Sequence, residues 1–193
     1  YWIMNKMINE TKKRRYMLSA SLKYDVTKWL NVTGRVKVDN ADMDITNKRY
    51  AGTDTNFAGE KGLYNIEKRN DRQIYADAIA NVDLYFADDY HLTANVGGSI
   101  KDVQMDLMGW GGDLRKIPNF FSITNISTTN YKEREDGSHI QSQSIFANVE
   151  LAWKSMLYLT VTGRNDWESA LAFSKYKSFF YPSVGLSAVV SEM

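Results

Sequence analysis

The sequence predicts an all-β fold, an antiparallel meander of about seven transmembrane strands. Two observations predict it. Apolar and polar residues alternate over seven segments, and these segments are joined by connections that alternate between short and long. Alternation with period two places one kind of side chain on each face of a strand. Short turns at one end and long loops at the other are typical of an outer-membrane β-barrel.

The seven segments are each roughly 10 residues long, which is about the length that a tilted strand needs to cross a bilayer. In the first of them, Leu18, Ala20 and Leu22 alternate with Ser19 and Ser21. The segments are residues 15–25, 30–39, 74–86, 91–101, 144–153, 157–166 and 180–190.

The connections between these segments differ in length. Tight turns are expected at 25–28, 87–90 and 154–156, and an intermediate connection at 167–178. The connections at about 40–72 and 102–142 are expected to be long polar loops. Loops of that length are uncommon in a soluble β-sandwich, so the pattern favours a barrel.

Aromatic residues gather near the ends of the segments. Such rows of rings are typical of the two interfaces between a membrane and water. The alternative is that aromatic residues simply favour strands. Those beside the tight turns are Tyr24, Trp29, Phe86, Tyr90, Trp153 and Tyr158, and those toward the opposite ends are Tyr16, Tyr75, Phe180 and Tyr181.

The composition excludes several other classes of protein. The 193 residues carry 24 Lys and Arg against 23 Asp and Glu, so the overall charge gives no argument for binding nucleic acid. The 44% of hydrophobic residues excludes a disordered chain. No apolar run approaches the roughly 18–20 residues of a helical membrane span. The absence of cysteine excludes disulfides, a thiolate metal site and a cysteine nucleophile.

We predict no enzyme activity, because no group of residues has the spacing of a catalytic site. His91 and His139 are isolated in the sequence. Asp166 and Glu168 are two residues apart, as a glycosidase pair would be, but Asp166 is expected to pair with Arg164 on the same strand face. No cofactor and no metal site is predicted.

Two charged clusters have functional alternatives that the sequence favours less. Asp39, Asp42 and Asp44 offer calcium ligands but lack the glycine and the final glutamate of an EF-hand, which favours a solvated loop. The basic run 12–15 is expected to open the first strand as a solvated end. Contact with anionic lipid headgroups or with nucleic acid is the alternative for this run.

The long segment 102–142 is predicted to contain the substrate-binding residues, in an extracellular loop. Aromatic rings among amides and carboxylates can stack on sugar rings and bond their hydroxyls. They can equally form the loop's own packing cluster, or a surface that grips a lid protein. The predicted residues are Trp110, Asp113, Phe120, Phe121 and Tyr131.

The polar set of alternating residues is predicted to face away from lipid. Its charged members are Arg35, Lys37, Asp77, Asp83, Glu150, Arg164 and Asp166. The strings Val32-Thr33-Gly34-Arg35 and Val161-Thr162-Gly163-Arg164 occupy equivalent places after a short turn, which indicates repeated hairpins.

Three segments together resemble a known family. They are Tyr24-Asp25-Val26-Thr27-Lys28-Trp29-Leu30, Gly163-Arg164-Asn165-Asp166-Trp167-Glu168-Ser169 and Phe180-Tyr181-Pro182-Ser183-Val184-Gly185-Leu186-Ser187. Their order and spacing are similar to the barrel region of SusC/RagA-type TonB-dependent outer-membrane transporters of Bacteroidetes. The resemblance runs over nearly the whole chain. The Arg-Asn-Asp-Trp and Phe-Tyr-Pro-Ser strings are its most specific parts, and the opening Tyr1-Trp2 also fits a strand start.

The resemblance implies that residues 1–193 are a central excerpt of a large outer-membrane β-barrel, of the 22-strand kind. Plug, TonB box and remaining strands are then absent from this sequence. Such proteins import oligosaccharides or similar large nutrients across the bacterial outer membrane, using energy relayed by TonB, with a SusD-like surface lipoprotein as lid. The polar face would line the lumen or touch the plug, the apolar face would contact outer-membrane lipid, and nucleic acid is not an expected partner.

Two other hypotheses remain open at this point. A soluble all-β carbohydrate-binding module would use the same aromatic residues for sugar binding. A small self-contained porin-like barrel would need an eighth strand, and the sequence shows no eighth alternating segment.

Overall fold

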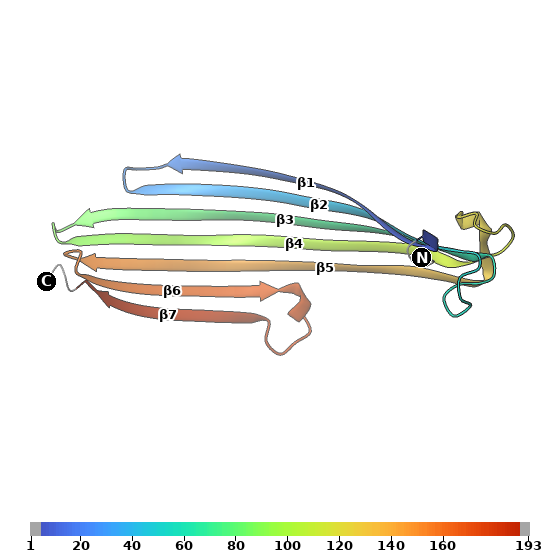
Figure 1. Cartoon of the computed structure of the whole chain (residues 1–193). Coiled ribbons are helices and arrows are strands. Elements are labelled where there is room, and N and C mark those ends of the chain that lie inside the picture. Colours follow the sequence, from blue (N-terminus) through green and yellow to red (C-terminus); the bar gives the residue numbers. More distant parts are fainter. Residues whose placement is uncertain (1–4, 190–193) are drawn as a thin grey trace. The chain divides into compact units, whose positions relative to one another are not determined.

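The computed structural model describes residues 5–189, which contain one seven-stranded sheet in the order β1-β2-β3-β4-β5-β6-β7 (Figure 1). Each strand pairs with its neighbours in the chain, so the sheet is the predicted all-β antiparallel meander. The strands are β1 (Met7–Asp25), β2 (Leu30–Tyr50), β3 (Gly62–Phe86), β4 (Tyr90–Leu114), β5 (Ile126–Trp153), β6 (Leu157–Glu168) and β7 (Ser178–Ala188), with short 3-10 helices at Ile123–Asn125 and Ser169–Leu171.

The three predicted tight turns are confirmed to within a residue. In the turn from β5 to β6, Lys154 and Ser155 have φ of 52° and 56°, and Met156 N donates to Trp153 O at 2.9 Å. Two left-handed central residues are characteristic of a type I′ turn, whose twist matches that of the flanking strands. Ala87 and Asp88 take the same conformation between β3 and β4, with φ of 51° and 56°.

The strands are longer than the sequence predicted, and the predicted bounds of the long loops, 40–72 and 102–142, were wrong. β2 to β5 each have 21 to 28 residues, and the loops shrink to 51–61 and 115–125. The alternation does not continue in phase to the strand ends: in β2, for example, the apolar residues change face after Val38, to Ala41, Met43 and Ile45. A pattern search that needs one apolar face therefore cannot detect these outer parts of the strands.

Three residues predicted in a long loop lie on strands for the same reason. Trp110 and Asp113 are in β4 and Tyr131 is in β5, so only Phe120 and Phe121 of that set lie in a loop. The basic run 12–15 lies inside β1, which begins at Met7, and does not open it.

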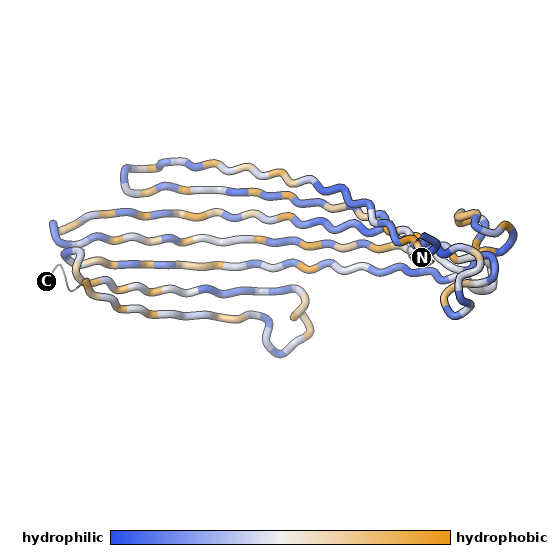
Figure 2. Tube along the Cα trace, in the orientation of Figure 1, coloured by the Kyte–Doolittle hydropathy of each residue, from blue (hydrophilic) through white to orange (hydrophobic). Residues whose placement is uncertain are grey.

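The chain divides into two compact units. The first unit is Tyr1–Tyr16, Asp39–Arg72 and Gln104–His139, and the second is Met17–Val38, Gln73–Val103 and Ile140–Met193. The alternating segments of the sequence fall almost entirely within the second unit. Figure 2 shows the alternation of hydrophobic and hydrophilic residues along the strands. Tyr1-Trp2 and Val190, the last residue of the final predicted segment, lie outside the described residues.

In the second unit, strand pairing brings like residues together. Val149 of β5 pairs with Val161 of β6, which pairs in turn with Val184 of β7. One position along, Asn148 pairs with Thr162. Because directly opposed residues share a face, one face of these strands is apolar and the other is polar.

The apolar face of the second unit exposes many large apolar side chains. Leu22 is 75% exposed and Val184 is 72% exposed, whereas the side chain of Asp77 on the polar face has no accessible surface. A protein that folds in water buries its large apolar side chains and leaves carboxylates outside. Leu22, Val184 and Asp77 of the second unit depart from that rule. Further exposed members of the apolar face are Leu18, Val32, Val36, Val96, Ile100, Ile145, Leu159, Val161 and Leu186.

Among residues 5–189, no helix has the length and apolar character needed to cross a membrane.

Candidate functional site

The polar face of the second unit is organised around a buried carboxylate. Arg35 Nε of β2 donates to Asp77 Oδ1 of β3 at 2.9 Å and to Oδ2 at 3.2 Å. Tyr75 of β3 and Ser99 of β4 lie close to this pair on the same face. A buried carboxylate is costly unless it is paired and hydrogen-bonded. Arg35 supplies the partner that it needs.

A second arginine on this face is held in a similar way. Arg164 Nε donates to Asp166 Oδ1 at 2.7 Å, and Arg164 Nη2 donates to Ser144 Oγ at 3.1 Å. The predicted pair of Asp166 with Arg164 is therefore confirmed. Both Val-Thr-Gly-Arg strings thus end in an arginine whose Nε is bound by an aspartate, from the neighbouring strand for Arg35 and from the same strand for Arg164.

The remaining predicted polar residues make smaller contacts on these strands. Asp83 Oδ1 lies 2.8 Å from His91 Nε2, and the His91 ring stacks on Tyr85 with 3.9 Å between centroids. Glu150 Oε2 accepts a hydrogen bond from Thr160 at 3.2 Å. Lys37 follows Arg35 by two residues, which places it on the same face of β2. His91 thus has a local polar partner.

Sequence reasoning missed an apolar contact on the polar face. A Cβ at Gly97 would lie 2.8 Å from Phe146 Cζ, 3.0 Å from Ile79 Cγ1 and 2.7 Å from the Ala78 carbonyl oxygen. Phe146 therefore packs over the bare backbone of Gly97. The signal was the Gly97-Gly98 pair inside a strand, because glycine within a strand marks a close approach.

In the first unit, the loops 51–61 and 115–125 are fastened to each other. Asn119 N donates to Lys61 O at 3.1 Å, and Asn119 Oδ1 accepts from Ala51 N at 2.7 Å. The Phe121 ring packs edge-on against Tyr50 with 4.9 Å between centroids. Phe121 thus packs against the end of β2, and its predicted role in binding substrate stays a prediction.

Asn125 holds the loop 115–125 in shape. Its Oδ1 accepts from the backbone N of Lys116 at 3.0 Å and of Ile117 at 3.1 Å. Its Nδ2 donates to Ile117 O at 2.7 Å and to Phe120 O at 2.9 Å. This buried amide uses all of its hydrogen-bonding capacity, so the loop backbone around it is fixed.

Of the other predicted substrate-binding residues, one makes a structural hydrogen bond, two line a hollow and one is exposed. Asp113 Oδ1 accepts a hydrogen bond from Gly59 N at 2.7 Å, which ties β4 to the loop 51–61. Trp110 and Tyr131 line a hollow of about 350 Å³. Phe120 is 51% exposed. Their role in binding substrate stays a prediction.

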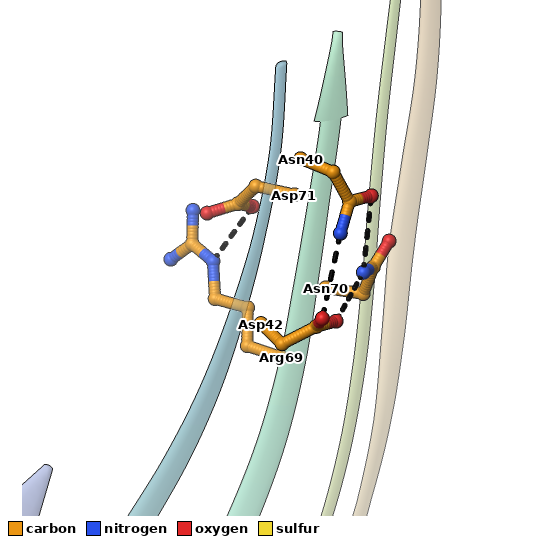
Figure 3. Close-up of polar contacts among 5 residues, drawn as sticks. All are labelled: Asn40, Asp42, Arg69, Asn70 and Asp71. Atoms are coloured by element: carbon orange, nitrogen blue, oxygen red, sulfur yellow. Dashed lines mark hydrogen bonds and ion pairs between the residues drawn. The ribbon is translucent and has the colours of Figure 1, made fainter. Parts of the chain in front are cut away.

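The polar side chains in Figure 3 lie on β2 and β3 of the first unit. Asn70 Nδ2 donates to Asp42 Oδ1 at 2.5 Å and to Asn40 Oδ1 at 3.4 Å. Separately, Arg69 Nε donates to Asp71 Oδ1 at 2.9 Å. Asp42, one of the three candidate calcium ligands, is thus hydrogen-bonded to amides.

The other two candidate calcium ligands contact arginines of β1. Arg15 Nε donates to Asp39 Oδ1 at 2.8 Å, and this hydrogen bond lowers the pKa of the Asp39 carboxyl below its usual value. Arg14 Nη2 lies 4.0 Å from Asp44 Oδ2. Over residues 5–189, no three His, Asp or Glu side chains gather in a group able to hold a metal ion.

Comparison with known proteins shows which solved structures have a similar fold. No protein-family model matches the sequence, and no curated protein matches it. Among solved structures, the chain is similar to the RagAB peptide transporter, with a TM-score of 0.85 and 15% identity over 95% of this chain. It is also similar to the siderophore receptor PiuA from Acinetobacter baumannii, with a TM-score of 0.54 and 14% identity over 92% of this chain.

The fold is that of a barrel wall of a TonB-dependent receptor. The RagAB peptide importer in its open-open state gives a TM-score of 0.81 at 15% identity, again over 95% of this chain. The chain spans 20% of the matched RagAB chain and 29% of the siderophore receptor. In barrels of this kind the apolar residues face lipid and the polar residues face the interior.

Proposed function

We propose that this chain forms part of the barrel wall of a TonB-dependent transporter in a bacterial outer membrane. One observation carries the proposal: the second unit exposes its apolar face and buries a carboxylate on its polar face. Hydrocarbon is the solvent in which that arrangement is favourable, because apolar side chains there lose nothing by exposure.

The aromatic residues and the sheet edges support the same placement. Trp29 and Trp153 lie beside tight turns, where a row of amphipathic rings would meet a membrane interface. β1 and β7 are the edges of the sheet, and unpaired backbone groups in lipid cost several kcal/mol each. Closure of the sheet by further strands is therefore part of the proposal.

The cargo that we propose is a large nutrient, in the first instance an oligosaccharide or a molecule of similar size. A peptide is the second candidate, because the RagAB structures, to which the chain is similar, are described as a peptide transporter. A SusD-like surface lipoprotein as lid and TonB as energy source complete the proposed machine. Arg35, Lys37, Asp77, Asp83, Glu150, Arg164 and Asp166 would line its lumen or touch its plug.

A soluble carbohydrate-binding module is the alternative function. It would need the alternating apolar residues in a packed interior, and Leu18, Val36 and Ala78 are all exposed. The barrel wall is therefore favoured.

Expression of residues 1–193 in water and in detergent tests the placement in a membrane. We expect the chain to stay monodisperse only in detergent or lipid, because its apolar face would cause aggregation in water unless detergent or lipid shields it. A monodisperse soluble monomer without detergent would overturn the proposal.

Transport is tested on the complete protein that contains this chain. A bacterial strain without this protein should no longer grow on the nutrient that the protein imports. Membranes isolated from that strain should no longer bind the nutrient. Location of the protein in the cytoplasm, or unchanged uptake for every oligosaccharide and peptide supplied, would contradict a transport role.

A further inference from the structure

The hollow beside Trp110 lies where β4 meets β5 and the loop 115–125. Gly109 and Gly111, on either side of Trp110 in β4, belong to the other face of the strand. A Cβ at Gly111 would lie 2.0 Å from Asn65 Oδ1, which leaves no room for a side chain at that position. The hollow of about 350 Å³ is lined by Trp110, Gly111, Ile123, Ile126, Ser127, Thr128, Tyr131 and Glu133.

The charge of this hollow has one sign. Glu133 is the only Asp, Glu, Lys, Arg or His among its lining residues. Side chains alternate along β5, so Arg134 points to the other side, where it forms ion pairs with Glu67 at 3.7 Å and Asp136 at 3.5 Å. Within residues 5–189, no lysine or arginine forms an ion pair with Glu133, so its carboxylate is left for a ligand.

A larger hollow of the same unit provides a contrast. It measures about 810 Å³ and is also lined by Tyr131, but its charged groups are of both signs: Arg49 and Lys132 stand with Glu60 and Asp113. That mixture selects no sign of ligand charge. The smaller hollow joins two aromatic rings to a single carboxylate.

We propose that the Trp110 hollow binds a cationic side chain, the guanidinium or ammonium group of a peptide. A cation over the face of a tryptophan or tyrosine ring is attracted by the negative face of the ring, and tryptophan gives the strongest such contact. The Trp110 and Tyr131 rings hold the cation and Glu133 neutralises it. As a subsite for cargo, this proposal rests on the proposed transport function and narrows its cargo to cationic peptides.

The wall of the hollow is held in place before any ligand binds. Ile123 and Ile126 stand on either side of Asn125, whose four hydrogen bonds fix the loop backbone. A site that is already formed loses little conformational entropy when it binds. Its volume also lies within the range of small-ligand sites, about 300–1,000 Å³.

The test compares acetylated tripeptides that contain arginine with the same tripeptides that contain citrulline, the neutral isostere of arginine. Binding is measured by titration calorimetry on the complete protein in detergent. We expect the arginine peptide to bind at least about tenfold more tightly than the citrulline peptide. Glu133→Gln should remove most of that difference, and Trp110→Ala should weaken the binding of the arginine peptide by about tenfold.

Two matched variants serve as controls. Glu135→Gln removes a carboxylate two residues farther along β5, and Phe173→Ala removes an exposed ring of the second unit, both outside the hollow. Both should bind the arginine peptide as the unmodified protein does. Glu133→Gln preserves the shape of the side chain, so it tests the charge even if Trp110→Ala fails to fold.

Equal affinity for the arginine and citrulline peptides would overturn the proposal. So would an unchanged preference for arginine in Glu133→Gln, or a neutral oligosaccharide whose binding depends on Trp110 while the arginine peptide's does not. Uptake is measured separately. Binding without uptake would contradict only the proposed transport function. Uptake without a preference for arginine would contradict only the proposal that the hollow binds a cationic side chain.

Discussion

The two units of this chain use the same strands in different ways. In the second unit, β5 and β6 place valine opposite valine on one face and asparagine opposite threonine on the other. In the first unit, β2 and β3 place Asn40 and Asp42 against Asn70, on the set of positions that is apolar in the second unit. The proposed placement in a membrane accounts for this difference, because hydrocarbon favours an apolar face and water does not.

β2 shows the change within a single strand. Val32, Val36 and Val38 lie on one face of the strand, and Asn40 and Asp42 continue the same face. Beyond Asn40, the apolar residues occupy the other face, as Ala41, Met43 and Ile45. The division between the two units falls at Val38 and Asp39, where this change of face occurs.

A charge on the apolar face of the second unit should have the largest effect. Val161→Arg is expected to lower the free energy of unfolding in lipid vesicles by about 2–4 kcal/mol, because an arginine at the middle of a lipid-facing strand must leave water. Thr162→Arg, one residue along on the polar face, is the matched control and should cost much less. Equal losses for the two variants would remove the distinction between the faces.

A methyl group at the close contact under Phe146 should have the next largest effect. Gly97→Ala should destabilise the second unit by about 1–3 kcal/mol, because the new Cβ would lie 2.7 Å from the Ala78 carbonyl oxygen and the backbone must shift. At Gly34 the nearest atom would be 4.0 Å away, so Gly34→Ala should be neutral or slightly stabilising. Denaturant titration of both variants checks this prediction, which fails if they lose equal stability.

Removal of the Asn125 amide should affect the first unit alone. Asn125→Ala should cost about 1–2 kcal/mol of local stability, because the amides of Lys116 and Ile117 lose their acceptor. Hydrogen exchange at these two amides should become faster, while amides of the second unit keep their rates. The exposed Thr124→Ala provides the control, and faster exchange spread over both units would contradict the local role.

The smallest expected effect is a pH dependence in the first unit. The pKa of Asp39 is lowered by Arg15, so the pair stabilises the fold fully above the unfolded pKa of about 3.9 and loses this contribution as pH falls through the lower folded pKa. Arg15→Gln should raise the pKa of Asp39 toward its usual value, as measured by NMR titration of the carboxyl carbon. An unchanged pKa would show that the hydrogen bond from Arg15 is not its cause.

The sequence predicted the second unit well because alternation carries the information there. The three turns and the Arg164–Asp166 pair follow from residues that are close in the chain. Arg35 and Asp77 are 42 positions apart in the chain. Which carboxylate faces Arg35 depends on the register between β2 and β3, and alternation alone does not define that register.

The first unit was predicted poorly for a physical reason. In its strands the alternation breaks or changes face, so β4 was expected to end before Trp110 and β5 was expected to begin after Tyr131. The hollow beside Trp110 arises from the meeting of two strands and a loop. No local pattern shows that Glu133 and Trp110 line the same space.

Spin labels along β6 test the central claim most directly, because the chain has no cysteine of its own and single cysteines can be placed at will. Labels at positions 159 to 162 of the protein in lipid vesicles are probed with oxygen, which dissolves in lipid, and with a nickel chelate, which dissolves in water. We predict strong oxygen collisions at 159 and 161 and weak ones at 160 and 162. Collisions that do not alternate, or a nickel chelate that reaches 159 and 161 freely, would contradict a hydrocarbon-facing surface.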